Sequence, residues 1–187
     1  MSWRPREATA RPGRKTPAVA ASVVVACLLA SPPLPATTVK RLGLEELIDA
    51  ADTIVQGRVQ AIHSFWRDRQ ICTEVTVAVS RALKGARRDR LTFTQVGGRV
   101  DAPVPLEMTV PGAPIYRIGD EAYFFLEPAG PGERIVVGLF QGRVPVRRDA
   151  QGEYVGARGA RKSPAQFDEE IRRHLAGQKP DRTAGAP

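Results

Sequence analysis

Two kinds of side chain in this sequence could support nucleophilic chemistry, a cysteine thiol and a histidine imidazole. The cysteines are Cys27 and Cys72, and the histidines are His63 and His174. A thiol attacks as its thiolate, which a neighbouring base helps to form. His63 and Cys72 flank a short polar turn, where paired strands would bring them together. A thiol-dependent enzyme using Cys72 and His63 is therefore one alternative, although we expect both side chains to be structural and assign no catalytic residue.

Cys72 falls among the polar residues of its predicted strand, which predicts a partly exposed thiol. If Cys27 leaves with an N-terminal leader, Cys72 is the only cysteine of the mature chain, and no intramolecular disulfide can form. An intermolecular disulfide in an oxidising compartment then stays open as a further alternative.

Metal and cofactor chemistry has no supporting pattern in this sequence. It contains no His-Glu-x-x-His, no Cys-x-x-Cys and no cluster of His, Asp and Glu at ligand spacing. The adjacent carboxylates at residues 45–46 and 168–170 point apart on a helix, so we expect solvated charges rather than an acid–base pair. Gly97 and Gly98 lack the context of a phosphate-binding loop. We expect no metal and no cofactor.

Five residues are candidate ligand contacts because of their type and position. Trp66 and Arg67 could form a stacking platform at the end of a hairpin. Arg99, Tyr116 and Arg117 belong to a long Gly- and Pro-rich region, where we expect exposed side chains. Packing within the fold is the alternative interpretation of each.

The net charge of +8 is concentrated at the two ends of the chain. Residues 1–36 carry five basic side chains against one acidic, and residues 156–187 carry seven against four. The intervening residues 37–155 carry 16 against 15, so the predicted folded body is nearly neutral. We therefore expect no phosphate-binding face and no nucleic-acid partner.

The first 36 residues follow the order of a secretory signal peptide. A basic stretch ends at Lys15, residues 18–30 form an uncharged apolar run, and residues 31–36 include small and helix-breaking residues. The apolar run is short for a membrane span. We expect cleavage after Ala36, export through the Sec pathway to the periplasm or the exterior, and no transmembrane helix in the mature chain. An uncleaved anchor and a lipoprotein attached at Cys27, which ends a Val-Val-Ala-Cys stretch, are the alternatives.

Apolar spacing predicts a short helix followed by a long hairpin. Residues 44–51 are apolar at helical spacing. Residues 54–66 and 71–83 alternate around a polar turn at residues 67–69, which predicts a long, coiled hairpin. In the first strand one face is expected to comprise Val55, Gly57, Val59, Ala61 and Phe65.

The second half of the chain predicts shorter strands and a final helix. Strands are expected over residues 91–96, 122–126 and 135–137, and in a hairpin of residues 143–146 with 154–155. Residues 97–114 are expected to form a long loop with residues 106–108 paired at an edge. Ser163 is the predicted N-cap of the last helix, with Gln166 completing a capping box.

Together these elements predict a mainly β fold. We expect a small, closed or nearly closed OB-like barrel of five to six antiparallel strands, with a short N-terminal helix and a C-terminal helix. The predicted organisation is a signal peptide (1–36), a barrel domain (37–156), a C-terminal helix (157–178) and a disordered tail (179–187).

Four segments together resemble known proteins. They are residues 51–59 (Ala-Asp-Thr-Ile-Val-Gln-Gly-Arg-Val), 82–85 (Ala-Leu-Lys-Gly), 117–128 (Arg-Ile-Gly-Asp-Glu-Ala-Tyr-Phe-Phe-Leu-Glu-Pro) and 137–142 (Val-Gly-Leu-Phe-Gln-Gly). In this order they resemble a group of uncharacterised exported bacterial proteins, over about residues 37–146. The order is also similar to the netrin-like module of the tissue inhibitors of metalloproteinases. That resemblance implies an OB-fold, netrin-like barrel.

The mechanism of those inhibitors does not carry over with the resemblance. They chelate a target zinc through an N-terminal cysteine and are held by many disulfides, whereas the predicted mature N-terminus here is Thr37-Thr38-Val39. We expect an exported, non-enzymatic binding or interaction domain. Its ligand, an unidentified protein or envelope component, would meet the 97–114 loop or an adjacent barrel face. A protease inhibitor acting through that loop or the N-terminus is the other alternative.

Overall fold

The computed structural model describes residues 40–156 and 161–177. The predicted signal peptide with Cys27, the predicted mature N-terminus at Thr37 and the predicted tail at residues 179–187 lie outside the described residues. In the part that is described, no helix combines the length and the apolar character needed to cross a membrane.

A long antiparallel hairpin forms the centre of the fold. Strand β1 (Thr53–Arg67) pairs with strand β2 (Gln70–Lys84) along almost its whole length. The connection is short because Asp68 takes a positive φ of 54°, a conformation that Asp tolerates better than most residues. The hairpin predicted from alternation is confirmed.

The faces of β1 depart from simple alternation in its second half. Val55 and Val59 are buried as predicted, but Ala61 is exposed and Ile62 packs against the core instead. The cause is a register shift between Val59 and Ala61. An extra residue in one strand of a pair moves every later side chain to the opposite face.

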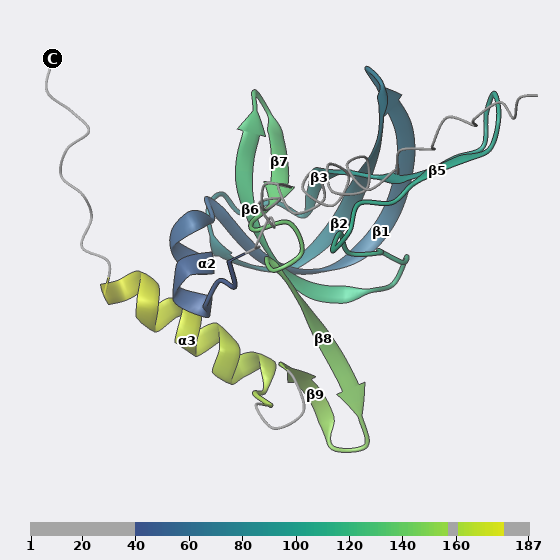
Figure 1. The fold of residues 1–187 in the computed structure, drawn as a ribbon. Helices are drawn as coiled ribbons and strands as arrows, with labels where there is room; N and C mark the ends of the chain where they lie inside the picture. Colours follow the sequence, from purple (N-terminus) through teal and green to yellow (C-terminus); the bar gives the residue numbers. More distant parts are fainter. Residues whose placement is uncertain (1–39, 157–160, 178–187) are drawn as a thin grey trace, which may run out of the picture. The chain divides into compact units, whose positions relative to one another are not determined.

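Seven strands form the main antiparallel sheet. Its order is β3 (Arg90–Val96), β2, β1, β6 (Glu121–Gly130), β8 (Arg143–Asp149) and β9 (Gly152–Val155), with β7 (Glu133–Val136) paired to β6. Strand β7 rises beside β3 and contacts it, but no ladder joins the two in the described residues (Figure 1). The mainly β class is confirmed. Among the described residues the strands outnumber the expected five to six, and their hydrogen-bonded order does not close into a barrel.

Strand β6 separates two hydrophobic cores. Its residues 122–126 are fully buried, as their continuous apolarity predicts. Phe124 packs in one core with side chains of β1, β2 and β3, whereas Tyr123 and Phe125 pack in the other. Successive side chains of a strand point to opposite faces, so a strand covered on both faces is apolar throughout.

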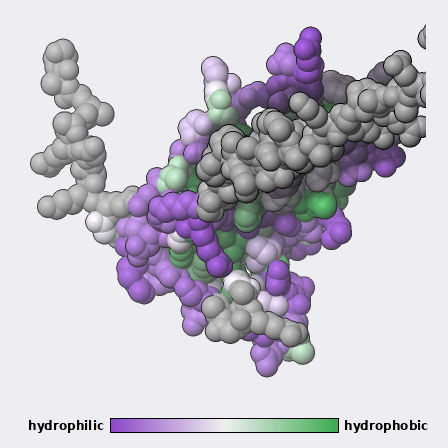
Figure 2. Space-filling model, viewed as in Figure 1, coloured by the Kyte–Doolittle hydropathy of each residue, from purple (hydrophilic) through white to green (hydrophobic). Residues whose placement is uncertain are grey.

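In the part of the chain that the structure describes, two helices cover the second core. Helix α2 (Leu44–Ala50) and helix α3 (Pro164–Gly177) contact each other and confirm the two predicted helices (Figure 1). Ser163 Oγ accepts a hydrogen bond from Gln166 N at 3.2 Å, and Gln166 Oε1 accepts one from Ser163 N at 2.9 Å. This is the predicted capping box. The visible surface of α3 is mainly hydrophilic (Figure 2).

One carboxylate of α3 is not solvated as expected. Asp168 is only 2% exposed, because it lies one helical turn before buried Ile171 and faces the sheet with it. Asp168 Oδ1 accepts a hydrogen bond from the Tyr123 hydroxyl at 2.6 Å, and its Oδ2 lies 2.5 Å from Nη1 of Arg81. The neighbouring Glu169 is exposed, in agreement with the prediction.

Candidate functional site

The segment over residues 97–114 folds into a short ribbon and a loop. Strand β4 (Gly98–Val100) pairs with strand β5 (Leu106–Met108) in a separate two-stranded sheet. The ribbon contacts β1 and β2 and projects beside them (Figure 1). Pairing of residues 106–108 is predicted from the sequence, and β4 is the partner strand that the prediction lacks.

Gly98 lets the ribbon approach the hairpin closely. Its φ is 131°, and a Cβ at this position would lie 2.1 Å from Thr73 Oγ1 and 2.7 Å from Ser64 Oγ. Thr73 Oγ1 donates a hydrogen bond to the Gly97 carbonyl at 2.6 Å. Gly97 N in turn donates to the Ile71 carbonyl at 2.7 Å. These contacts fix the base of the ribbon on β2.

A groove of about 320 Å³ lies between the ribbon, the loop after it and the sheet. It is lined by residues 62, 64, 73, 95–99, 107–110 and 113–116. Val96 and Ile115 form an apolar part of its wall and are 44% and 79% exposed. Gln95 Nε2 donates a hydrogen bond to the Pro114 carbonyl at 3.1 Å, which ties the loop to β3. The groove is therefore preformed, with apolar side chains facing solvent.

Three of the predicted contact residues occur in or near this segment. Arg99 and Tyr116 line the groove, whereas Arg117 is exposed and lies outside it. Arg99 is paired across the ribbon with Glu107, and its Nε lies 3.0 Å from Oδ1 of Asp101. The groove wall thus carries charges of both signs.

Tyr116 is not exposed as predicted. Only 7% of the residue is accessible, because its ring packs edge-on against Phe93 with the centroids 5.4 Å apart. The Arg143 guanidinium lies over the ring at 5.1 Å. The hydroxyl is buried and forms no hydrogen bond with any described residue. Burial raises the pKa of the Tyr116 hydroxyl well above its usual range, and the Arg143 charge opposes that rise.

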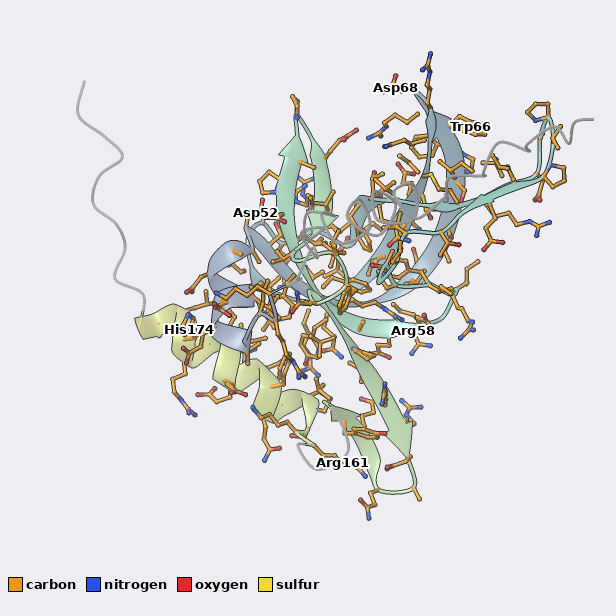
Figure 3. The ribbon with its side chains drawn as sticks, viewed as in Figure 1. Asp52, Arg58, Trp66, Asp68, Arg161 and His174 are labelled. Atoms are coloured by element: carbon orange, nitrogen blue, oxygen red, sulfur yellow. The ribbon has the colours of Figure 1, made fainter. Side chains whose placement is uncertain are left out.

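Trp66 and Arg67 are the last two residues of β1, at the turn of the β1–β2 hairpin, and do not line the groove. Figure 3 labels Trp66 at this end of the hairpin. Trp66 is 46% exposed. Arg67 is held by Glu133, with Nη2 and Oε1 2.9 Å apart, and its guanidinium lies 5.3 Å from the centre of the Phe65 ring. The proposed stacking platform thus has one accessible ring, and its arginine already has a carboxylate partner.

Cys72 is buried, contrary to the prediction of a partly exposed thiol. The register places it between Phe65 on β1 and Val96 on β3 as cross-strand neighbours. His63 pairs with Glu74 instead, and its ring stacks on Phe65. In the described residues no hydrogen bond joins the thiol to the imidazole, and no group of three or more His, Cys, Asp or Glu side chains could hold a metal.

Val96 and Ile115, the exposed apolar side chains of the groove, are not among the contact residues predicted from the sequence. Val96 ends a predicted strand, and Ile115 follows a proline in the Gly- and Pro-rich segment. The available signal was the presence of large apolar residues in a region otherwise expected to be solvated. These two side chains come together only because the β4–β5 ribbon forms. The alternation of apolar and polar residues in the sequence does not predict that ribbon.

Comparison of the chain with protein-family models, with curated proteins and with solved structures gives no match in any of the three.

Proposed function

We propose that the chain is a non-enzymatic binding domain that receives its ligand in the groove between the β4–β5 ribbon and the sheet. The observation that carries this proposal is the apolar surface that Val96 and Ile115 expose on the groove wall. Leu106, on the ribbon itself, is 49% exposed. Large apolar side chains gathered at a concave surface are typical of contact sites for ligands and partner proteins.

The anchoring of the groove supports the same proposal. Thr73 holds one side through the Gly97 carbonyl, and Gln95 holds the other through the Pro114 carbonyl. A site whose walls are already fixed loses little conformational entropy when a ligand enters. This arrangement suits recognition on a rigid scaffold.

The chemistry of the walls suits an extended peptide with apolar side chains. Val96 and Ile115 offer apolar contacts, and the exposed Glu107 can pair with a basic group of such a segment, whereas Arg99 already has Asp101 as its partner. A protease inhibitor acting through this segment would be a special case, in which the bound peptide belongs to a protease. A thiol-dependent enzyme gains no support, because Cys72 is buried.

The groove is tested by selecting ligands for it and then changing its wall. A random-peptide phage library is panned against the full chain, and the tightest peptide is titrated against variants by fluorescence anisotropy. Ile115→Asp should weaken binding by at least about tenfold, because it places a charge in the apolar contact. Ile118→Asp is the matched control, since Ile118 is 71% exposed and lies outside the groove.

The control variant should bind within about twofold of the wild type, because surface substitutions away from the contact change little. Selected peptides that bind Ile115→Asp as tightly as the wild type would contradict the proposal. So would equal losses in both variants, since a general effect of added negative charge would then explain the result.

We further propose that the protein is exported and processed after Ala36. Support comes from the order of basic, apolar and small residues over positions 1–36. Intact-mass measurement of protein recovered from the envelope and medium of expressing cells should give a chain that begins at Thr37. A chain that retains Met1, or a diacylated chain that begins at Cys27, would contradict this processing.

A further inference from the structure

Basic side chains converge on a second pocket, at the opposite end of β2 from the groove. The pocket has a volume of about 360 Å³. Its basic side chains come from β2, from the turn after β2 and from helix α3, and they are Arg81, Lys84, Arg87, Arg88 and Arg172. Asp89 is the one acidic residue in the wall among the described residues. The wall therefore carries a clear excess of positive charge.

Two of these side chains have partners inside the fold and hold the wall in place. Arg81 is paired with the buried Asp168 at 2.5 Å. Lys84 Nζ donates a hydrogen bond at 2.8 Å to the carbonyl of Ile48, near the C-terminal end of α2. A cation at the C-terminus of a helix is favourably placed. These contacts join β2 to both helices and involve two of the residues that line the pocket.

The other three basic side chains have no such partner. Arg87, Arg88 and Arg172 are exposed, and none forms an ion pair or hydrogen bond with another described residue through its side chain. Like charges that gather around one pocket repel one another, and an anion placed between them removes that repulsion. The unpartnered guanidinium groups are thus available to a ligand.

The chemistry of the wall favours a phosphate-type oxyanion. Guanidinium groups bind phosphate oxygens through paired hydrogen bonds, and several arginines match a ligand with several charged oxygens. The pocket volume is at the lower end of the range for small-molecule sites, about 300–1,000 Å³, and leaves room for more than one phosphate group. We propose that this pocket binds an oxyanion carrying two or more negative charges, through Arg87, Arg88 and Arg172.

The near-neutral charge of residues 37–155 is compatible with such a site. A nearly neutral net charge argues against an extended basic face. The net charge is a sum over all residues, however, and does not show whether basic side chains cluster locally. Arg172 lies in the C-terminal segment, which is counted apart from residues 37–155, and the fold brings it to the turn after β2.

Titration of the full chain with sodium pyrophosphate by isothermal calorimetry tests the site. We expect saturable binding that Arg172→Gln weakens by at least about tenfold, since a charge-assisted hydrogen bond is lost. The double variant Arg87→Gln/Arg88→Gln should show an equal or larger loss. Arg173→Gln is the matched control, because it removes the same charge from the next position of α3 and lies outside the pocket.

A second arm identifies the source of the oxyanion. Co-sedimentation with phosphatidylcholine vesicles containing cardiolipin, whose headgroup carries two phosphate groups, is measured for the same variants. Pyrophosphate binding that Arg172→Gln weakens supports a free phosphate ligand. Vesicle binding that Arg172→Gln weakens, in the absence of pyrophosphate binding, supports a lipid headgroup. The proposal is overturned if neither probe binds, or if Arg173→Gln weakens binding as much as Arg172→Gln does.

Discussion

Buried hydroxyl groups show how the same residue type differs in its role at two positions of this fold. Tyr116 precedes strand β6 and Tyr123 lies within it, and both are buried. The Tyr123 hydroxyl donates to Asp168 Oδ1 at 2.6 Å, with the Pro164 carbonyl at 3.1 Å as a second acceptor, whereas that of Tyr116 has no described partner. A buried polar group stabilises the fold only when it is hydrogen-bonded.

Phenylalanine at each position separates the two roles. Tyr123→Phe should lower the free energy of unfolding by about 1–3 kcal/mol, because it breaks a buried hydrogen bond to a carboxylate. Tyr116→Phe removes an unpartnered hydroxyl and keeps the ring, so the free energy of unfolding should stay the same or rise by up to about 2 kcal/mol. Urea denaturation measures both values. A loss at Tyr116 as large as that at Tyr123 would mean that the Tyr116 hydroxyl is hydrogen-bonded.

At the scale of elements, helix α3 is attached to the sheet by both apolar and polar contacts. Phe167 packs edge-on against Tyr123 with the ring centroids 4.8 Å apart, and Ile171 is fully buried. The apolar stripe of this helix and its capping box are visible in the sequence. The sequence predicts a solvated charge at Asp168, and the structure differs because its partners Arg81 and Tyr123 come from distant strands.

Removal of the Asp168 carboxylate should therefore weaken the attachment of α3. We expect Asp168→Ala to lower the free energy of unfolding by about 2–4 kcal/mol, somewhat less than for a fully buried pair, because the Arg81 side chain is 49% exposed. Glu169→Ala is the control, with an expected change within about 0.5 kcal/mol since Glu169 is exposed. Chemical denaturation followed by circular dichroism gives both values. Equal effects of the two substitutions would show that the buried contact adds no stability.

At the scale of the whole molecule, local patterns predict the elements better than their assembly. Alternation locates β1 and β2, and continuous apolarity locates the doubly covered β6. The bulge after Val59, the pairing of β4 with β5 and the open edge at β3 depend on contacts between distant segments, which a single sequence does not encode in its periodicity.

For the candidate sites, too, the sequence predicts the segment better than the arrangement of its side chains. The sequence points to residues 97–114 as a recognition segment, and the groove lies there. It does not show that Tyr116 turns inward, that Cys72 is covered by its neighbours, or that Arg172 joins the arginines after β2. Each of these depends on tertiary packing, which decides whether a polar side chain faces solvent or the core.

Hydrogen–deuterium exchange of the full chain, measured with and without the selected peptide, tests the binding groove most directly. Bound peptide should slow exchange in residues 95–99, 107–110 and 113–116, which line the groove, and leave the β8–β9 hairpin unchanged. Protection confined to other segments, or no protection at saturating peptide, would contradict the assignment of this groove as the ligand site.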